Sequence, residues 1–320
     1  MTSAMHSMEI NCVHTLPVQI WIDGEEHTPS IENAVVQGDA LWVMGQQVLL
    51  KSTDGIHWQD AAANLRLEGS FLVSSVSNGP EGLRVFARSR NGLRCYGWDI
   101  WTLKWEVLFS VPTSAPGIVA AWTKRGLLVA ARHDPDTEIL RQGIDSDDSP
   151  WKRAVVSGVA VHLQIQSSGV GLCATRGVGR TTQNPDTIPS AVFFTEDFGS
   201  NWREIAALQT MLLTGVPINQ ESALVGGTGG VLAEVNSGGL ENIWQENGGD
   251  VVAVDVKGAR RIAILESDDE PAIHGLLTLE AGLWRRRDVS FIDRIQCVKL
   301  FNEGIVVVGT RRALFLCRLS

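Results

Sequence analysis

Short apolar runs, separated by turns rich in glycine, aspartate or other charged residues, recur along the whole chain. Residues 34–60, AVVQGDALWVMGQQVLLKSTDGIHWQD, show the pattern, and residues 117–155 and 215–247 repeat it. The runs are rich in β-branched residues and bounded by turn residues, as strands are. No segment keeps the 3.6-residue period of an amphipathic helix. The pattern therefore predicts an all-β protein built from short strands.

Tryptophans mark a longer repeat within this pattern. Six of them lie 40 to 51 residues apart, and one more near the N-terminus extends the series to seven. A repeat of about 40–45 residues is the length of a four-stranded blade in a β-propeller. We expect each tryptophan to open the fourth strand of its blade. The series is Trp21, Trp58, Trp105, Trp151, Trp202, Trp244 and Trp284.

The two ends of the chain complement each other in this scheme. Residues 295–320 supply three apolar runs, and residues 17–24 (PVQIWIDG) supply one strand around Trp21 before the first blade begins. Pairing these segments would complete a last blade and leave no open edge in the ring. We therefore predict a seven-bladed β-propeller of four-stranded antiparallel blades, closed by the N-terminal strand. Residues 1–320 are predicted to form a single domain.

A turn motif precedes several of these tryptophans. Its fullest copy is TEDFGSNW at residues 195–202; STDGIHW at 52–58 is one residue shorter, and TLEAGLW at 278–284 is weaker. Aspartate in a tight turn accepts backbone N–H groups, a Ser or Thr hydroxyl bonds locally, and glycine takes a positive φ. The tryptophan would then pack as an apolar wedge between neighbouring sheets. The motif is therefore predicted to be a structural hairpin.

The pattern S/T-x-D-x-G-x-x-W resembles the Asp-box, or BNR repeat, of β-propellers. Proteins with this repeat include sialidases, some other glycosidases, sortilin-like receptors and a seven-bladed photosystem assembly factor. The resemblance implies a WD40-like architecture in which the motif joins the third and fourth strands, on the face opposite the usual pocket. Asp54 and Asp197 are then expected to hold turns and not to catalyse a reaction or bind calcium.

Charged residues gather where the second strand of each blade is expected to end. In propellers these ends share a face with the blade-to-blade connections and line the pocket. Four of the seven blades place arginine there, and forked guanidinium donors suit a carboxylate, a phosphate or an acidic protein surface. Alternatively, these arginines are solvated or paired with Glu266, Asp134 and Asp268. The candidate binding residues are Arg88, Arg90, Arg132, His133, Arg176, Arg180, Glu266 and Arg311.

The longest of these connections covers residues 176–190, RGVGRTTQNPDTIPS. Long loops in compact domains are often functional or mobile. We consider two hypotheses for it: a lid over the mouth of the ring, or a tolerated surface insertion.

An enzymatic site is difficult to place in this sequence. The Arg-Ile-Pro signature of sialidases is absent, and the only tyrosine, Tyr96, lies in a predicted strand where core packing is its simplest role. Glycosidases need two carboxyl groups in different environments, and the obvious pair, Glu266 and Asp268, shares one loop. Residues 133–138 (HDPDTE) fit a solvated turn better than a metal site. We therefore expect no metal and no cofactor.

The sequence thus favours a non-catalytic binding or assembly propeller that captures a protein partner or an anionic ligand on the arginine-bearing face. Two alternatives remain open. One is a glycoside hydrolase or lyase that acts on an anionic sugar, with arginines gripping its carboxylate. The other is a cytoplasmic immunity or inhibitor protein, a special case of partner binding.

Composition narrows the partners and the location. The chain has 27 Lys and Arg against 36 Asp and Glu, a net charge of −9, whereas nucleic-acid binding needs a basic face. No stretch approaches the ~20 apolar residues of a membrane span, and the N-terminus lacks the features of a secretory signal. The five cysteines are far apart and form no CxxC pair, which favours free thiols in a reducing compartment. We predict a cytoplasmic protein with no nucleic-acid or membrane partner.

Overall fold

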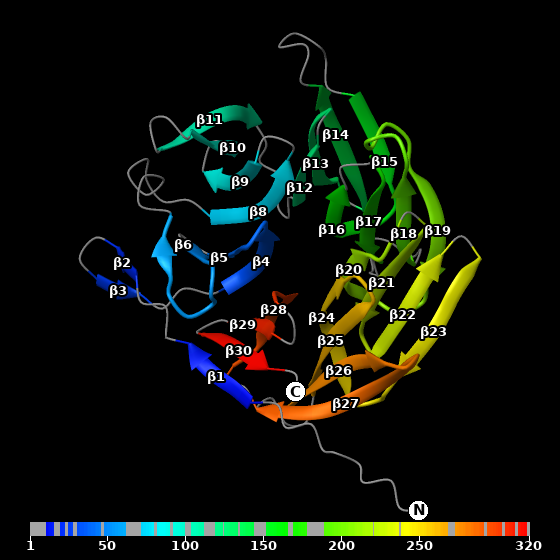
Figure 1. The fold of residues 1–320 in the computed structure, drawn as a ribbon. Helices are drawn as coiled ribbons and strands as arrows, with labels where there is room; N and C mark the ends of the chain where they lie inside the picture. Colours follow the sequence, from blue (N-terminus) through cyan, green and yellow to red (C-terminus); the bar gives the residue numbers. More distant parts are fainter. Residues whose placement is uncertain are drawn as a thin grey trace, which may run out of the picture.

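The computed structural model describes strands and turns along most of the chain. The described residues contain no helix long and apolar enough to cross a membrane. Their strands form seven four-stranded antiparallel sheets and one two-stranded sheet, and the larger sheets are the blades of a ring (Figure 1). The predicted seven-bladed β-propeller is therefore confirmed. The described residues are 11–15, 20–22, 25–27, 31–45, 48–61, 72–79, 82–89, 92–99, 104–111, 119–123, 125–133, 135–143, 152–165, 169–177, 189–219, 221–236, 238–267, 273–290, 293–302, 305–310 and 313–318.

We number the blades in chain order. Blades 1 to 3 contain β4 (Ile31–Gln37), β5 (Ala40–Gly45), β6 (Val48–Ser52), β7 (Gln59–Asp60), β8 (Leu72–Gly79), β9 (Gly82–Ser89), β10 (Gly92–Asp99), β11 (Lys104–Val111), β12 (Val119–Thr123), β13 (Gly126–His133), β14 (Asp136–Gly143) and β15 (Lys152–Val156). Blades 4 and 5 contain β16 (Val159–Ile165), β17 (Gly171–Arg176), β18 (Ser190–Thr195), β19 (Arg203–Leu208), β20 (Leu212–Pro217), β21 (Ser222–Gly227), β22 (Val231–Asn236) and β23 (Gly239–Gln245). Blades 6 and 7 contain β24 (Gly249–Lys257), β25 (Arg260–Ser267), β26 (Ile273–Glu280), β27 (Leu283–Ser290), β28 (Ile295–Leu300), β29 (Ile305–Thr310), β30 (Leu314–Arg318) and β1 (Asn11–Thr15).

The first strand of each blade lies innermost, since the first strands of adjacent blades contact one another around the ring. Strands within a blade follow chain order and run antiparallel. The second and fourth strands therefore end on one face of the ring, which we call the second-strand face. The connections between first and second strands and between third and fourth strands lie on the other, which we call the turn face.

The N-terminal strand closes blade 7, as predicted, but it is not the strand around Trp21. The closing strand is β1, which pairs with β30 from Asn11↔Arg318 to Thr15↔Leu314. Trp21 lies in β2 (Ile20–Ile22), which pairs with β3 (Glu25–His27) in the separate two-stranded sheet. The sequence between these strands is Asp-Gly, a strong hairpin signal. This local pairing removes Trp21 from blade 7 and leaves the preceding segment to close the ring.

The tryptophans mark the blades less regularly than predicted. Trp58 and Trp202 directly precede β7 and β19, whereas Trp105 and Trp284 are the second residues of β11 and β27. Trp244 is instead the sixth residue of β23 and stands near its end, so the prediction is wrong there. Trp151 lies outside the described residues.

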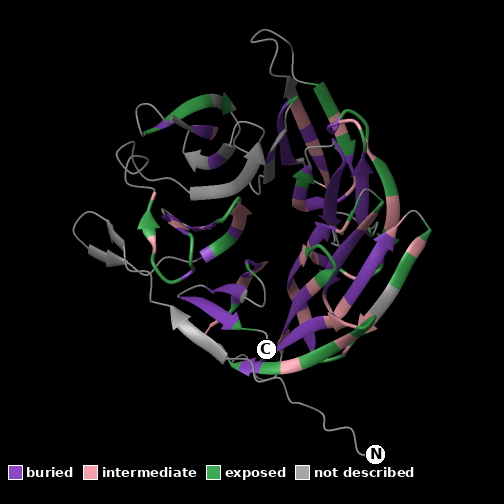
Figure 2. Ribbon diagram, in the orientation of Figure 1, coloured by how far each residue is buried: buried purple, intermediate pink, exposed green. Residues whose placement is uncertain are grey.

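The hydrophobic core is divided among the interfaces between adjacent blades, and buried positions line these interfaces (Figure 2). Trp105 of blade 2 packs in one cluster with Met44 and Leu49 of blade 1. Its indole Nε1 donates a hydrogen bond to the Ala61 carbonyl oxygen at 2.8 Å. This is the predicted tryptophan wedge. Tyr96 is 4% exposed in the same cluster, so its predicted core role is confirmed.

The innermost strands share an irregularity that the sequence did not reveal. In six blades the ladder between the first and second strands slips by one residue near the start of the first strand. Such a bulge bends the strand and increases its local twist. The repeated bulge therefore curves the inner strands at the same level of the ring. The positions are Ile31/Asn33, Val73/Ser75, Ala160/His162, Leu212/Thr214, Val251/Ala253 and Ile295/Cys297.

The prediction of free thiols is wrong at one cysteine. Cys317 in β30 is disulfide-bonded. Cys95, Cys173 and Cys297 are free and buried, and burial raises the pKa of each thiol to about 12. The wide spacing of the cysteines in the sequence concealed the bonded one, because the ring brings the two ends of the chain together.

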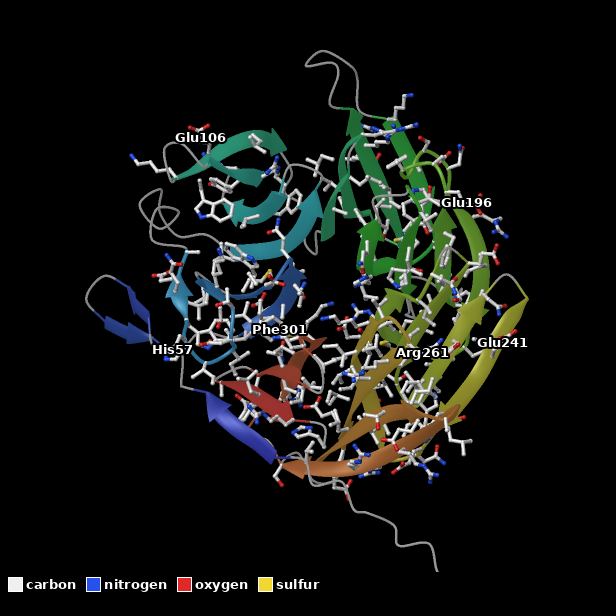
Figure 3. The ribbon with its side chains drawn as sticks, viewed as in Figure 1. His57, Glu106, Glu196, Glu241, Arg261 and Phe301 are labelled. Carbon is white, nitrogen blue, oxygen red and sulfur yellow. The ribbon has the colours of Figure 1, made fainter. Side chains whose placement is uncertain are left out.

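A buried carboxylate joins blade 6 to blade 7. Asp255, 2% exposed in β24, accepts hydrogen bonds from Lys299 Nζ at 2.6 Å and from the Leu300 backbone N–H at 2.8 Å. Beside it, Lys257 Nζ donates to the backbone oxygen of Phe301, which lies toward the centre of the ring (Figure 3). Polar bonds therefore reinforce this interface of the ring.

Replacing Asp255 with Ala should lower the free energy of unfolding by about 2–4 kcal/mol, because it leaves Lys299 and the Leu300 N–H without their acceptor. Denaturant titration measures the change. The matched control is Asp288→Ala, which removes an exposed carboxylate paired with Arg286 and should cost about 0–1 kcal/mol. Equal losses in the two variants would contradict a specific role for Asp255.

Candidate functional site

Arginines do stand at the ends of second strands. Arg88 and Arg132 are the next-to-last residues of β9 and β13, and Arg176 is the last residue of β17. Glu266 is the next-to-last residue of β25 and His133 is the last of β13. Strand order therefore places all five at the second-strand face. The predicted residues Arg90, Arg180 and Arg311 lie outside the described residues, as do the side chains of Arg88, Arg132 and His133.

Arg176 is the predicted arginine whose side chain the structure describes. It is partly exposed and makes no hydrogen bond or ion pair within the described part of the chain. Several arginines elsewhere have carboxylate partners: Arg261 lies 2.8 Å from Glu234, and Arg287 lies 2.6 Å from Glu280. The pairing of Arg176 with Glu266, one of the alternatives from the sequence, is not observed.

Small hydroxyl side chains fix the backbone on both sides of Arg176. Buried Thr137 Oγ1 donates to the Gly158 carbonyl oxygen at 2.7 Å and accepts the Ala160 N–H at 2.8 Å. Ser190 Oγ accepts the N–H groups of Gly177 at 2.9 Å and Leu212 at 3.0 Å. These bonds link blades 3, 4 and 5 at the second-strand face. Arg176 therefore extends from a rigid rim.

Blade 6 carries a row of ionisable residues at the same level. Glu266 is the cross-strand partner of both Asp250 and His274, so the three side chains share one face of the sheet. Asp250 Oδ1 accepts the Gly229 N–H of blade 5 at 3.0 Å. His274 is fully buried, and desolvation lowers its pKa. Sequence reasoning missed Asp250 and His274, because only the register of three strands aligns them with Glu266.

The inner strand of blade 4 carries a polar pair, His162 and Gln164. His162 Nε2 in β16 lies 3.4 Å from Gln164 Oε1. Desolvation lowers the pKa of His162 to about 4, the charge of Lys299 acts in the same direction, and the hydrogen bond with Gln164 opposes them. His162 is therefore neutral at pH 7. The charge of Lys299 in blade 7 thus acts on His162 in blade 4, although the two residues are far apart in the chain.

The turn at residues 195–202 uses the polar groups of Thr195, Asp197 and Asn201 internally. Asp197 Oδ1 accepts the Thr195 hydroxyl at 2.8 Å and the Asn201 N–H at 2.9 Å, and Oδ2 accepts Asn201 Nδ2 at 2.6 Å. The Gly199 N–H donates to Thr195 Oγ1 at 3.0 Å, and Trp202 Nε1 donates to the Gly199 carbonyl oxygen at 3.2 Å. Burial would raise the pKa of Asp197, but these bonds outweigh it and hold the pKa below its ordinary value.

The turn at residues 52–58 repeats this arrangement. Ser52 Oγ donates to Asp54 Oδ1 at 3.0 Å, and the same oxygen accepts the N–H groups of Ile56 and His57, each at 2.8 Å. His57 Nδ1 lies 2.6 Å from Asp54 Oδ2. The His57 side chain first, and then the backbone N–H groups, hold the pKa of Asp54 well below its usual range.

The weaker copy at residues 278–284 keeps the first of these bonds. Thr278 Oγ1 donates to Glu280 Oε1 at 2.9 Å. Arg287 Nη2 also donates to this oxygen, at 2.6 Å. The predicted turn chemistry is therefore confirmed in blades 1 and 4, whereas blade 6 keeps only the bond from the Thr hydroxyl. All three turns lie on the turn face, away from Arg176.

The structure does not test several other parts of the predicted site. Residues 178–188 of the long connection lie outside the described residues, so its role as a lid stays a prediction. Asp268 and Asp134 lie outside them too. Within the described ranges, no group of three or more His, Cys, Asp or Glu side chains could hold a metal ion. The acidic residues Glu106, Glu196 and Glu241 lie at the periphery of the ring (Figure 3).

Comparison with solved structures establishes the fold. No protein-family profile matches the sequence, and no curated protein matches it. The structure of YCF48 from Cyanidioschyzon merolae has a TM-score of 0.66 and 13% identity, and the match covers 96% of this chain and 98% of that one. The chain folds as a WD40- and YCF48-like propeller.

Two further structures show the same likeness. YCF48 bound to D1 peptide has a TM-score of 0.65 at 13% identity, with 97% of this chain and 95% of that chain covered. The structure of the RRP9 WD40 repeats also has a TM-score of 0.65 at 13% identity, and the match covers 92% of this chain and 96% of that one. At this level of identity, the likeness concerns architecture alone.

Gly199→Ala should destabilise the protein by about 2–4 kcal/mol. Gly199 has φ = 79°, and an added Cβ would lie 2.0 Å from Leu128 Cδ2 of blade 3, so the substitution combines backbone strain with overpacking. The matched control is Gly282→Ala, where φ is 80° and no atom lies within 4 Å of the added Cβ. It should cost about 1–2 kcal/mol. Thermal unfolding of both variants measures the difference, and equal losses would contradict the close packing of this turn against blade 3.

His162 should make stability depend on pH. The folded protein keeps His162 neutral down to about pH 4, whereas an unfolded histidine takes up a proton near pH 6.5. Between these values the unfolded state binds more protons, so the free energy of unfolding falls as the pH is lowered. His162→Gln removes this source of pH dependence. Between pH 7 and 4.5, the free energy of unfolding of this variant should fall by about 1–3 kcal/mol less than that of the wild type. Urea titrations at the two pH values measure it, and parallel losses would contradict the assignment.

Proposed function

We propose that this protein is a non-catalytic binding propeller that holds a protein partner, or another anionic ligand, on its second-strand face. The observation that carries the proposal is Arg176. It stands at the end of β17, partly exposed, on a backbone braced by Thr137 and Ser190, and its charge has no partner among the described residues. A guanidinium offers two parallel N–H donors to a carboxylate, which gives bidentate recognition.

The strand positions of Arg88 and Arg132 support the same face. Both stand at the equivalent strand position in blades 2 and 3, which supports an arc of arginines along the rim of blades 2 to 4. Arg311 follows β29 directly in the sequence and extends this set to blade 7. In a chain with a net charge of −9, such an arc would attract acidic groups locally while the rest of the surface repels them.

Two further points support a binding function. Propellers of similar architecture include one whose structure contains a bound peptide, YCF48 with D1 peptide. The acids of the turns at residues 52–58 and 195–202 are occupied by internal hydrogen bonds, which leaves them poorly suited to acid–base chemistry. We infer that these turns are Asp-box hairpins with a structural role.

The triple variant Arg132→Ala/Arg176→Ala/Arg311→Ala tests the proposal. An array of 12-residue peptides would identify ligands of the wild type, and fluorescence anisotropy would give their affinities. We expect the bound peptides to be rich in Asp and Glu. We expect the triple variant to bind them at least about tenfold more weakly, because each charge-assisted bond lost is worth about 1.5–3 kcal/mol.

The matched control is Arg203→Ala/Arg260→Ala/Arg285→Ala, which removes the same charge from exposed positions on other parts of the ring. It should bind within about twofold of the wild type, since distant charges are screened. Equal losses in the two variants would contradict the proposed face. Release of fluorophore from 4-methylumbelliferyl glucuronide or sialoside by the wild type, abolished in the triple variant, would favour the hydrolase instead.

A further inference from the structure

The disulfide of Cys317 lies where the ring closes. Cys317 is the fourth residue of β30, and its direct cross-strand partner in β1 is Cys12. Cys95, Cys173 and Cys297 are free, and the chain has five cysteines in all. Elimination and register therefore indicate the same partner for Cys317.

We propose that Cys12 and Cys317 form a cross-strand disulfide that stabilises the closed propeller ring when it is oxidised and no longer does so when it is reduced. In the oxidised protein the bond ties the closing strand β1 to β30. In the reduced protein, β1 is held to blade 7 by its backbone ladder with β30. The redox state of this pair thus sets how firmly blade 7 is completed.

The position of the disulfide makes it effective in holding β1 to β30. β1 is the outermost strand of blade 7 and comes from the opposite end of the chain (Figure 1). The bond closes a loop that contains nearly the whole sequence, and a disulfide that closes a longer loop restricts the unfolded chain more. Fraying of an outer strand at a chain terminus is an ordinary local opening. The crosslink prevents the two strands from separating fully.

Burial determines how the bond is made and broken. Cys317 is fully buried, in the core cluster between blades 6 and 7. A thiolate must reach a sulfur atom for exchange, so a reductant acts after β1 has lifted from β30. Formation proceeds through a mixed disulfide with a small disulfide oxidant such as oxidised glutathione. One cysteine thiolate displaces a glutathione thiolate, and the second cysteine then displaces the other, so the protein gives up two electrons and two protons.

Thiol counting on the full-length wild type tests the pairing without any variant. Protein equilibrated with oxidised glutathione, then denatured and alkylated, should label at Cys95, Cys173 and Cys297 alone. A second sample is reduced with dithiothreitol, denatured while dithiothreitol is still present, and then alkylated. It should be labelled at all five cysteines. Peptide mass spectrometry of the unreduced protein should show Cys12 linked to Cys317. Five labelled thiols in the oxidised sample, or another linked pair, would overturn the proposal.

Thermal unfolding tests the fastening effect. The oxidised wild type should unfold about 5 °C or more above the reduced wild type, and Cys12→Ser should unfold near the reduced value with or without dithiothreitol. Cys95→Ser, which removes a buried free thiol from blade 2, is the matched control and should keep the full response to dithiothreitol. An equal response in Cys12→Ser would overturn the proposal, as would an unfolding temperature in the wild type that does not change on reduction.

Discussion

Each blade of this propeller buries its apolar side chains against its two neighbours, so the stability of every blade depends on closure of the ring. Strand β30 shows the constraint most directly. Its residues alternate between the two interfaces: Leu314 and Leu316 pack against blade 1, whereas Phe315 and Cys317 pack against blade 6. A sheet with two apolar faces has no stable place at the end of a row, because one face would stay in water. Blade 7 therefore needs blade 1 and blade 6 on its two sides. The hydrogen bonds of Asp255 and the disulfide of Cys317 both lie in or beside this blade.

The fold could be predicted from the sequence because its signals are local. In the turn at residues 195–202, the hydrogen bonds of Asp197 all lie within eight residues, and Thr195 and Asp197 are recognisable in the sequence for that reason. The errors arose where pairing was not local or a local signal was overlooked. Asp23-Gly24 favours a hairpin around Trp21, and that hairpin left the closing of blade 7 to β1. The bulges of the first strands escaped prediction because they are shifts in the register between paired strands, and the six positions share no common residue type.

The site could be predicted only in outline. Strand ends follow from the pattern of apolar runs, so the positions of Arg88, Arg132 and Arg176 were predictable. Which charges meet there depends on the register between strands and on the order of blades in space. Glu266 was predicted beside arginines, whereas the structure aligns it with Asp250 and His274 in its own blade. The charge of Lys299 in blade 7 helps to lower the pKa of His162 in blade 4, an effect that no short segment of the sequence encodes.

Separation of the two faces explains how this architecture can persist when sequences diverge. The turn face and the blade interfaces contain the groups on which folding depends, such as the Asp197 turn and the buried Thr137, whose hydroxyl accepts the Ala160 N–H of the next blade. The ends of second strands differ in this respect: Thr310 is buried and bonded to Ala313, whereas Arg176 is partly exposed. Substitution at the exposed ends should cost little stability. Exposed residues of the second-strand face can therefore change while the ring is retained, which is consistent with similar folds at 13% identity. The likeness of the fold therefore says nothing about a partner, and a test of the proposed function has to start from the charge and spacing of the rim residues.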